Sequence, residues 1–122
     1  MALAQHLIGL GVAPELARRL GNEPSAKTGV TTALATGTAI TNNFTMTTTA
    51  SSQTAFVLPS VEAGSGPFLI TNPSATTALI YPNTSSETIN GGSAGASVSL
   101  AQNKTALYFK TGALTWVGIL TA

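Results

Sequence analysis

Residues 104–120 read KTALYFKTGALTWVGIL. Leucine, aromatic and β-branched residues fill both halves of this stretch, and Thr111-Gly112 supplies turn residues between the halves. The pattern predicts a hairpin of two strands, over residues 104–110 and 113–120. Bulky apolar side chains fall on both faces, as in Leu107-Tyr108-Phe109. Such a strand is buried on both sides, under a loop of its own domain or under another subunit, and the sequence leaves both readings open.

The same β pattern extends back from the hairpin to Val30. Clusters of Gly, Pro, Asn and Ser recur at intervals of about 8–12 residues, as in sandwiches and barrels. Further strands are predicted over residues 30–34, 37–48, 53–58, 67–72, 77–81, 87–90 and 96–100. The expected fold class is therefore mainly β, a jelly-roll-like antiparallel β-sandwich with a short N-terminal helical segment.

The first 22 residues differ in composition from the rest. Leucines recur there at helical spacings, Pro14 suits a first helical turn, and Gly21 suits a C-terminal cap. Three units are predicted: a helical anchor over 1–22, a linker over 23–30 and a β-sandwich over 31–122. The arginines follow the apolar stretch, unlike in a signal peptide, and no apolar run approaches the roughly 20 residues of a membrane span. We therefore expect synthesis in the cytoplasm and no membrane partner.

Charged side chains are rare after the linker. Between Thr28 and Ala122 the chain carries only Glu62, Glu87, Lys104 and Lys110, whereas an ordinary domain is roughly a quarter charged. Its polarity comes from 20 threonines and 11 serines, and aspartate is absent from the chain. The net charge of +1 is too small for electrostatic capture of nucleic acid or acidic lipid. This composition favours a surface that packs against other protein subunits.

The sequence offers little material for catalysis. Its one histidine, His6, lies in the helical segment, so no base accompanies the many hydroxyls of the β domain. We interpret His6 as a surface or interface residue, and Glu62 and Glu87 as solvated loop charges rather than a catalytic carboxylate pair. The glycine-rich loop over 91–95 lacks the lysine of a phosphate-binding loop. With no cysteine and no aspartate, we predict no enzyme activity, no metal and no cofactor.

Three aromatic residues leave a binding alternative open. Trp116, Tyr81 and Tyr108 would form a sugar-binding platform if they were exposed, with Asn and Thr side chains as hydrogen-bond partners. Large rings in a small β domain more often fill its core. We therefore favour core positions for them.

One series of motifs carries a family resemblance. It begins with Asn72-Pro73-Ser74 and a strand ending in Tyr81-Pro82, and continues with Ile89-Asn90-Gly91, Val98-Ser99-Leu100, an aromatic strand over 105–109 and a terminal strand with Leu114-Thr115-Trp116. This series, over about residues 53–120, resembles small β-domains of tailed-bacteriophage virion proteins, including capsid cement (decoration) proteins and modules of tail fibres. Its motifs are turn and strand signatures and include no catalytic residue.

The resemblance implies a structural role in a virion. The expected function is that of a cement protein, which binds the outside of the phage head at contacts between major capsid protein subunits and stabilises it. We expect a homo-oligomer, either dimer or trimer, at the capsid surface. The alternative is a receptor- or glycan-binding module of a tail fibre or tail tip. Tyr108 and Trp116 are possible subunit-interface residues, and the predicted capsid-binding residues are Leu7, Leu10, Leu16, Arg18, Arg19 and Leu20.

Overall fold

The computed structural model describes residues 24–121. This part of the chain consists of ten β-strands and one short 3₁₀ helix, which confirms the prediction of a mainly β domain. The elements are β1 (Pro24–Thr28), the 3₁₀ helix η1 (Leu34–Thr36), β2 (Thr38–Ala39), β3 (Phe44–Thr48), β4 (Ala55–Val57), β5 (Phe68–Asn72), β6 (Ala78–Tyr81), β7 (Thr88–Ile89), β8 (Val98–Leu100), β9 (Lys104–Gly112) and β10 (Thr115–Leu120). The predicted helical anchor over 1–22 lies outside the described residues.

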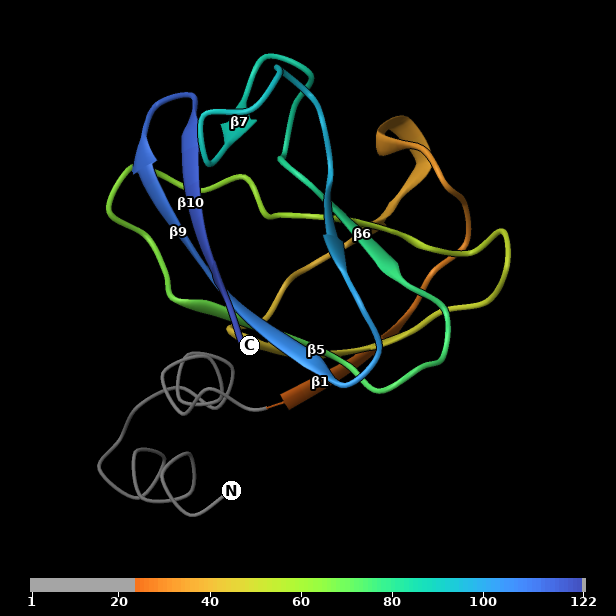
Figure 1. Cartoon of the computed structure of the whole chain (residues 1–122). Coiled ribbons are helices and arrows are strands. Elements are labelled where there is room, and N and C mark those ends of the chain that lie inside the picture. Colours follow the sequence, from red (N-terminus) through yellow and green to blue (C-terminus); the bar gives the residue numbers. More distant parts are fainter. Residues whose placement is uncertain (1–23, 122) are drawn as a thin grey trace, which may run out of the picture.

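The strands form two sheets (Figure 1). Sheet A has the order β1-β3-β5-β9-β10-β7, and sheet B has the order β2-β4-β6-β8. The first six strands alternate between the sheets, so the chain makes three successive turns. Neighbouring turns pair in parallel: in sheet A, Pro24 pairs with Phe44 and Phe44 with Leu69, offsets of 20 and 25 residues. Stacked parallel turns of this kind are typical of a β-solenoid.

The last strands close the stack with reversed direction. β8 pairs antiparallel with β6 in sheet B, and β9 pairs antiparallel with β5 in sheet A. β10 then pairs antiparallel with β9, and the two strands run side by side in Figure 1. The short β7 pairs in parallel with the other side of β10. The hairpin predicted at the C-terminal end of the chain is therefore part of sheet A.

The predicted jelly-roll-like antiparallel topology is not the one that the strands form. A jelly roll is made of antiparallel Greek keys. Within residues 24–121, five of the eight pairs of named strands are parallel. The strands alternate apolar and polar side chains in either topology, so the pattern does not distinguish them. The connection over residues 58–67, for example, crosses from β4 in sheet B to β5 in sheet A instead of reversing the chain beside β4.

The inner faces of the two sheets share one hydrophobic core. In β5, buried and half-buried residues alternate, as expected for a strand with one face inward. The core includes three rings of sheet A, those of Phe68, Tyr108 and Trp116, and residues of the middle strands β4 and β6 of sheet B. Its fully or nearly fully buried members are Ile40, Phe56, Leu58, Phe68, Ile70, Ala78, Ile80, Ile89, Leu100, Ala106, Tyr108 and Trp116.

Asn72, the last residue of β5, is a fully buried polar side chain at the end of this core. Its Oδ1 accepts hydrogen bonds from the Thr47 hydroxyl and the Ser74 backbone N–H, both at 3.1 Å. Its Nδ2 donates to the carbonyls of Thr76 at 3.0 Å and Leu100 at 2.9 Å. One amide therefore ties together β3, β8 and the loop after β5, and it uses two donors and two acceptor sites.

The N-terminal part of the β domain differs from its prediction. The linker predicted over 23–30 contains strand β1, which pairs with β3 along its whole length. The strand predicted over 30–34 is instead a bend that leads into η1. It crosses from sheet A to sheet B, where the Thr31 carbonyl accepts hydrogen bonds from the backbone N–H groups of Thr54 and Ala55.

The turn of the C-terminal hairpin also differs. β9 continues through Gly112, and the two-residue turn is Ala113-Leu114 rather than Thr111-Gly112. The register between β9 and β10 shifts at Thr115 and Trp116. Thr115 pairs with Gly112 and Trp116 pairs with Lys110, so Thr111 is the one extra residue of a β-bulge.

Candidate functional site

The outer face of sheet A is apolar, and its large side chains are half-buried or exposed in the part of the chain that the structure describes. One row of side chains crosses four strands in register, from Phe44 through Leu69 and Leu107 to Ile119. Ile119 is 59% exposed and Met46 is 43% exposed. We call this surface the open face. Its large apolar side chains are Phe44, Met46, Leu69, Leu107, Phe109, Val117 and Ile119.

The open face carries no charged side chain within residues 24–121. Lys110 pairs with the buried Trp116 and therefore lies on the opposite side of β9. Threonines occupy many of the remaining outward positions, and the hydroxyl groups of Thr105 and Thr71 form a hydrogen bond of 3.0 Å across β9 and β5. Contiguous apolar patches on a protein surface mark interaction sites. The open face is therefore a candidate protein–protein interface.

The outer face of sheet B is different, because the chain itself covers part of it. Ala55 pairs with Leu79 and lies on the outer side of β4, yet it is 0% exposed. The segment over residues 31–37 crosses it, and the Tyr81 hydroxyl donates a hydrogen bond of 2.8 Å to the carbonyl of Thr32. Sheet A has no such cover among residues 24–121. The sequence left open whether a loop or another subunit covers the second apolar face of the hairpin. The described residues supply no such loop.

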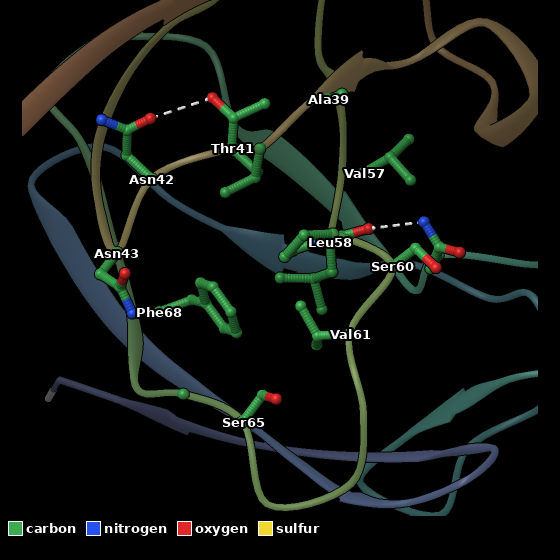
Figure 2. A pocket seen from close by; sticks show the side chains of 14 residues that line it. Ala39, Thr41, Asn42, Asn43, Val57, Leu58, Ser60, Val61, Ser65 and Phe68 are labelled. Atoms are coloured by element: carbon green, nitrogen blue, oxygen red, sulfur yellow. Dashed lines mark hydrogen bonds between the residues drawn. The ribbon is translucent and has the colours of Figure 1, made fainter. Parts of the chain in front are cut away.

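A pocket of about 670 Å³ lies at one end of the two sheets. Figure 2 shows Phe68, Leu58 and Val61 directed toward the same space, with Phe68 contributed by β5 and the other two by the connection after β4. Phe68 and Leu58 are buried and form its apolar floor. The volume lies in the range of small-molecule sites, about 300–1,000 Å³.

The rim of the pocket is polar and uncharged. Thr41, Ser60 and Ser65 contribute hydroxyls, and three asparagines contribute amides. Asn43 donates from Nδ2 to the Pro67 carbonyl at 2.9 Å, and Asn83 donates to the Leu58 carbonyl at 3.0 Å. Figure 2 draws the bond to the Leu58 carbonyl as a dashed line. These bonds fix the rim. The pocket therefore suits a neutral ligand with both apolar and hydrogen-bonding groups.

A buried ion pair lies inside the domain between β7, β9 and β10. The Nζ of Lys110 is 2.7 Å from Oε1 of Glu87, and both side chains are about 5% exposed. The same Oε1 accepts a hydrogen bond of 2.6 Å from Nε1 of Trp116, and Oε2 accepts one of 3.1 Å from the Thr84 hydroxyl. The ammonium group also lies 5.2 Å from the centre of the Trp116 ring. The interpretation of Glu87 as a solvated loop charge is therefore wrong, whereas Glu62 is exposed as predicted.

Two opposing effects act on the pKa of Glu87. Burial raises the pKa, but the hydrogen bonds from Lys110 and Trp116, the positive charge of Lys110 and the Thr84 bond lower it, and together they prevail. The folded pKa thus lies below the ordinary value of 4.5. Glu87 stays ionised at neutral pH, with both oxygens engaged inside the domain. It is therefore placed as a structural anchor for the edge of sheet A and not as a proton donor.

The domain should lose stability in acid through Glu87. As the pH falls below 4.5, the unfolded chain takes up the proton first, because the folded pKa is lower. The contribution is fully present above the unfolded pKa and is lost as the pH falls through the folded pKa. Urea unfolding followed by the fluorescence of Trp116 at pH 7, 4.5 and 3 measures this. Glu87→Gln should show a weaker dependence on pH, and an equal dependence in both proteins would contradict the assignment.

The aromatic residues singled out in the sequence lie mostly inside the domain. Tyr108 is 2% exposed and Trp116 is 1% exposed, so the structure places these possible subunit-interface residues in the core instead. Their inward orientation follows from the register, since each alternates with an outward residue such as Leu107 or Val117. Trp116 is also 5.9 Å from Phe68, centroid to centroid. Tyr81 is half-buried and bonded to Thr32, so these three rings form no exposed sugar platform.

The predicted capsid-binding residues Leu7, Leu10, Leu16, Arg18, Arg19 and Leu20 lie outside the described residues. The sequence predicted a second apolar face on the hairpin that a loop or another subunit covers, but it did not identify the open face across four strands. Which of Leu107, Tyr108 and Phe109 points outward depends on the register. The pocket has no signal in the sequence, because its residues come from four separated segments.

Two further properties of residues 24–121 concern ligands and membranes. No group of three or more His, Cys, Asp or Glu side chains is close enough there to hold a metal ion. No helix of this region is long and apolar enough to cross a membrane.

Comparison of the chain with protein-family models, with curated proteins and with solved structures finds no match.

Proposed function

We propose that this protein is a structural virion protein, a capsid cement protein that binds the outside of a phage head at contacts between major capsid protein subunits. The observation that carries the proposal is the open face, which is an uncharged apolar surface. The β domain has few charged side chains, and two of them form a buried ion pair. A surface of this kind is suited to permanent packing against protein. The resemblance of residues 53–120 to small virion β-domains supports the same role.

The proposal divides the work between two parts of the chain. Leu7, Leu10, Leu16 and Leu20 would dock on the capsid, with Arg18 and Arg19 next to acidic groups of a capsid subunit. The β domain would project from this contact and add buried surface between neighbouring capsid subunits. A well-formed contact buries on the order of 1,600 Å². Such contacts resist the pressure of packed DNA by making subunit separation more costly.

Co-sedimentation of the full chain with capsids tests this function. The wild-type chain should sediment with capsids, and the pair Arg18→Glu with Arg19→Glu should reduce the bound amount at least tenfold. Lys27→Glu, a change of the same kind at a half-buried position on β1, is the control and should bind as the wild type does. Undiminished binding of the arginine variant would remove the anchor assignment, and no binding of the wild type would overturn the cement function.

The uncharged pocket favours a second candidate function, a receptor- or glycan-binding module of a tail fibre or tail tip. Its hydroxyl and amide rim over an apolar floor matches the mixed surface of a neutral sugar. A glycan array decides between the two functions. Specific hits that are lost in Ser60→Phe, which would fill the mouth of the pocket, would favour the receptor function.

A further inference from the structure

The open face raises the question of what covers it in the working protein. Seven large apolar side chains lie side by side across β3, β5, β9 and β10, and three of them are more than 40% exposed. The described residues cover part of the outer face of sheet B but leave the open face to solvent. A soluble protein seldom keeps such a surface free. Some partner with a matching surface is therefore expected.

We infer that the occupant of the open face is another copy of this chain, so that the protein is a homo-oligomer held together through sheet A. Charge is the first argument. Because the open face carries no charged side chain within residues 24–121, a second copy brings no like charge against it. A different protein partner would ordinarily be selected by complementary charge pairs, and this face offers none.

The layout of the open face is the second argument. The apolar row from Phe44 to Ile119 runs across the centre of the sheet, in register from strand to strand. Hydroxyl groups lie beside it, including the bonded pair Thr71 and Thr105. An apolar centre with a polar uncharged rim is the usual anatomy of an oligomer interface. Sheets also pack well on sheets, at a spacing of about 10 Å, and a copy of the chain supplies such a surface.

This inference does not depend on the virion assignment, because it is tested with no capsid present. The mass of the full chain is measured by light scattering and native mass spectrometry at several protein concentrations. The wild type should have a mass that is a multiple of 12.3 kDa. Ile119→Lys and Met46→Lys place a charge in the open face from two different strands. Each should shift the mass to that of one chain, or raise the concentration of half-dissociation about 100-fold or more.

Leu114→Lys is the matched control. The exposed fraction of Leu114, 53%, is similar to the 59% of Ile119. Leu114 lies in the β9–β10 turn, however, and not on the open face. Its variant should keep the wild-type mass. The fluorescence of buried Trp116 reports whether each variant is folded. The two lysine substitutions are on different strands, so if one variant fails to fold, the other still tests the inference.

Three outcomes would overturn the inference. The first is a wild-type chain that remains a single chain at tens of micromolar. The second is an oligomer whose mass both folded lysine variants retain. The third is a single chain that becomes an oligomer only when residues 1–22 are removed, since that result would mean that the chain's own N-terminal segment occupies the open face.

Discussion

Replacing Asn72 with leucine is expected to lower the free energy of unfolding by about 3–5 kcal/mol, a large share of the roughly 5–15 kcal/mol of a whole domain. The side chain is fully buried and makes four hydrogen bonds. Each bond contributes about 1 kcal/mol net, so the loss of all four accounts for a change of this size. The Ser74 backbone N–H loses its acceptor, whereas the Thr76 carbonyl still accepts from Thr49.

Asn72→Asp separates hydrogen bonding from shape. Aspartate has the same size and keeps the acceptor for Thr47 and Ser74, but it replaces the donor facing the Thr76 and Leu100 carbonyls with a second oxygen. At neutral pH it should be at least as destabilised as the leucine variant. Part of the stability should return in acid, because the protonated acid can donate to one carbonyl.

The control for both Asn72 variants is Asn83→Ala. Asn83 is half-buried and makes one hydrogen bond, to the Leu58 carbonyl. Its loss should cost about 1 kcal/mol. All variants are compared by urea unfolding with Trp116 fluorescence. If Asn72→Leu lowers the free energy of unfolding by no more than Asn83→Ala does, then the four hydrogen bonds of the Asn72 amide do not stabilise the domain as the geometry indicates.

Most strands could be predicted from the sequence, because alternation and turn residues are local signals. β5 and β6 were predicted to within a residue at each end, and Asn72 was recognised as the start of a turn. The pairing of strands was not predictable in the same way. A parallel coil and an antiparallel sandwich both need alternating strands and polar connections, and the difference between them depends on contacts between residues 20 or so positions apart. β1 was missed because Pro24 and Ser25 resemble a linker and owe their strand to pairing with β3.

The sequence indicated the type of candidate site, an uncharged packing surface, but not the residues that form it. The shortage of charge directed attention to protein packing surfaces, and the open face is a surface of this composition. Which side of the hairpin faces solvent depends on the register, and in that register Leu107 and Ile119 point outward while Tyr108 and Trp116 point inward. Tyr108 and Trp116 were possible interface residues because the hairpin has two apolar faces, but large rings stabilise the domain most when they are buried in it.

Glu87 illustrates a different limit of sequence reasoning. It follows Ser85 and Ser86, a context typical of an exposed loop, and its partner Lys110 is 23 residues away. Nothing local links the two. Their pairing follows from the position of β7 beside β10, which brings the start of β7 next to Lys110 on β9.

Breaking this ion pair from one side is the second change with a large expected effect. Lys110→Met should lower the free energy of unfolding by about 3–5 kcal/mol, because it leaves the Glu87 carboxylate buried without its counter-charge. Glu87→Gln should cost a similar amount, because it leaves the ammonium group of Lys110 buried beside the Trp116 ring. Glu62→Gln, the same change at an exposed carboxylate, should stay within about 0.5 kcal/mol of the wild type.

The double variant Glu87→Gln with Lys110→Met decides how the pair stabilises the domain. Glutamine keeps an oxygen to accept the Trp116 Nε1 bond, and methionine fills the lysine's volume without a charge. Replacing a buried ion pair with neutral groups of similar size is often neutral or stabilising. The double variant should therefore lie within about 1 kcal/mol of the wild type and above both single variants. If the two single losses simply add, the carboxylate and the ammonium group act independently, and the 2.7 Å contact between them contributes little to holding β7 and β10 against β9.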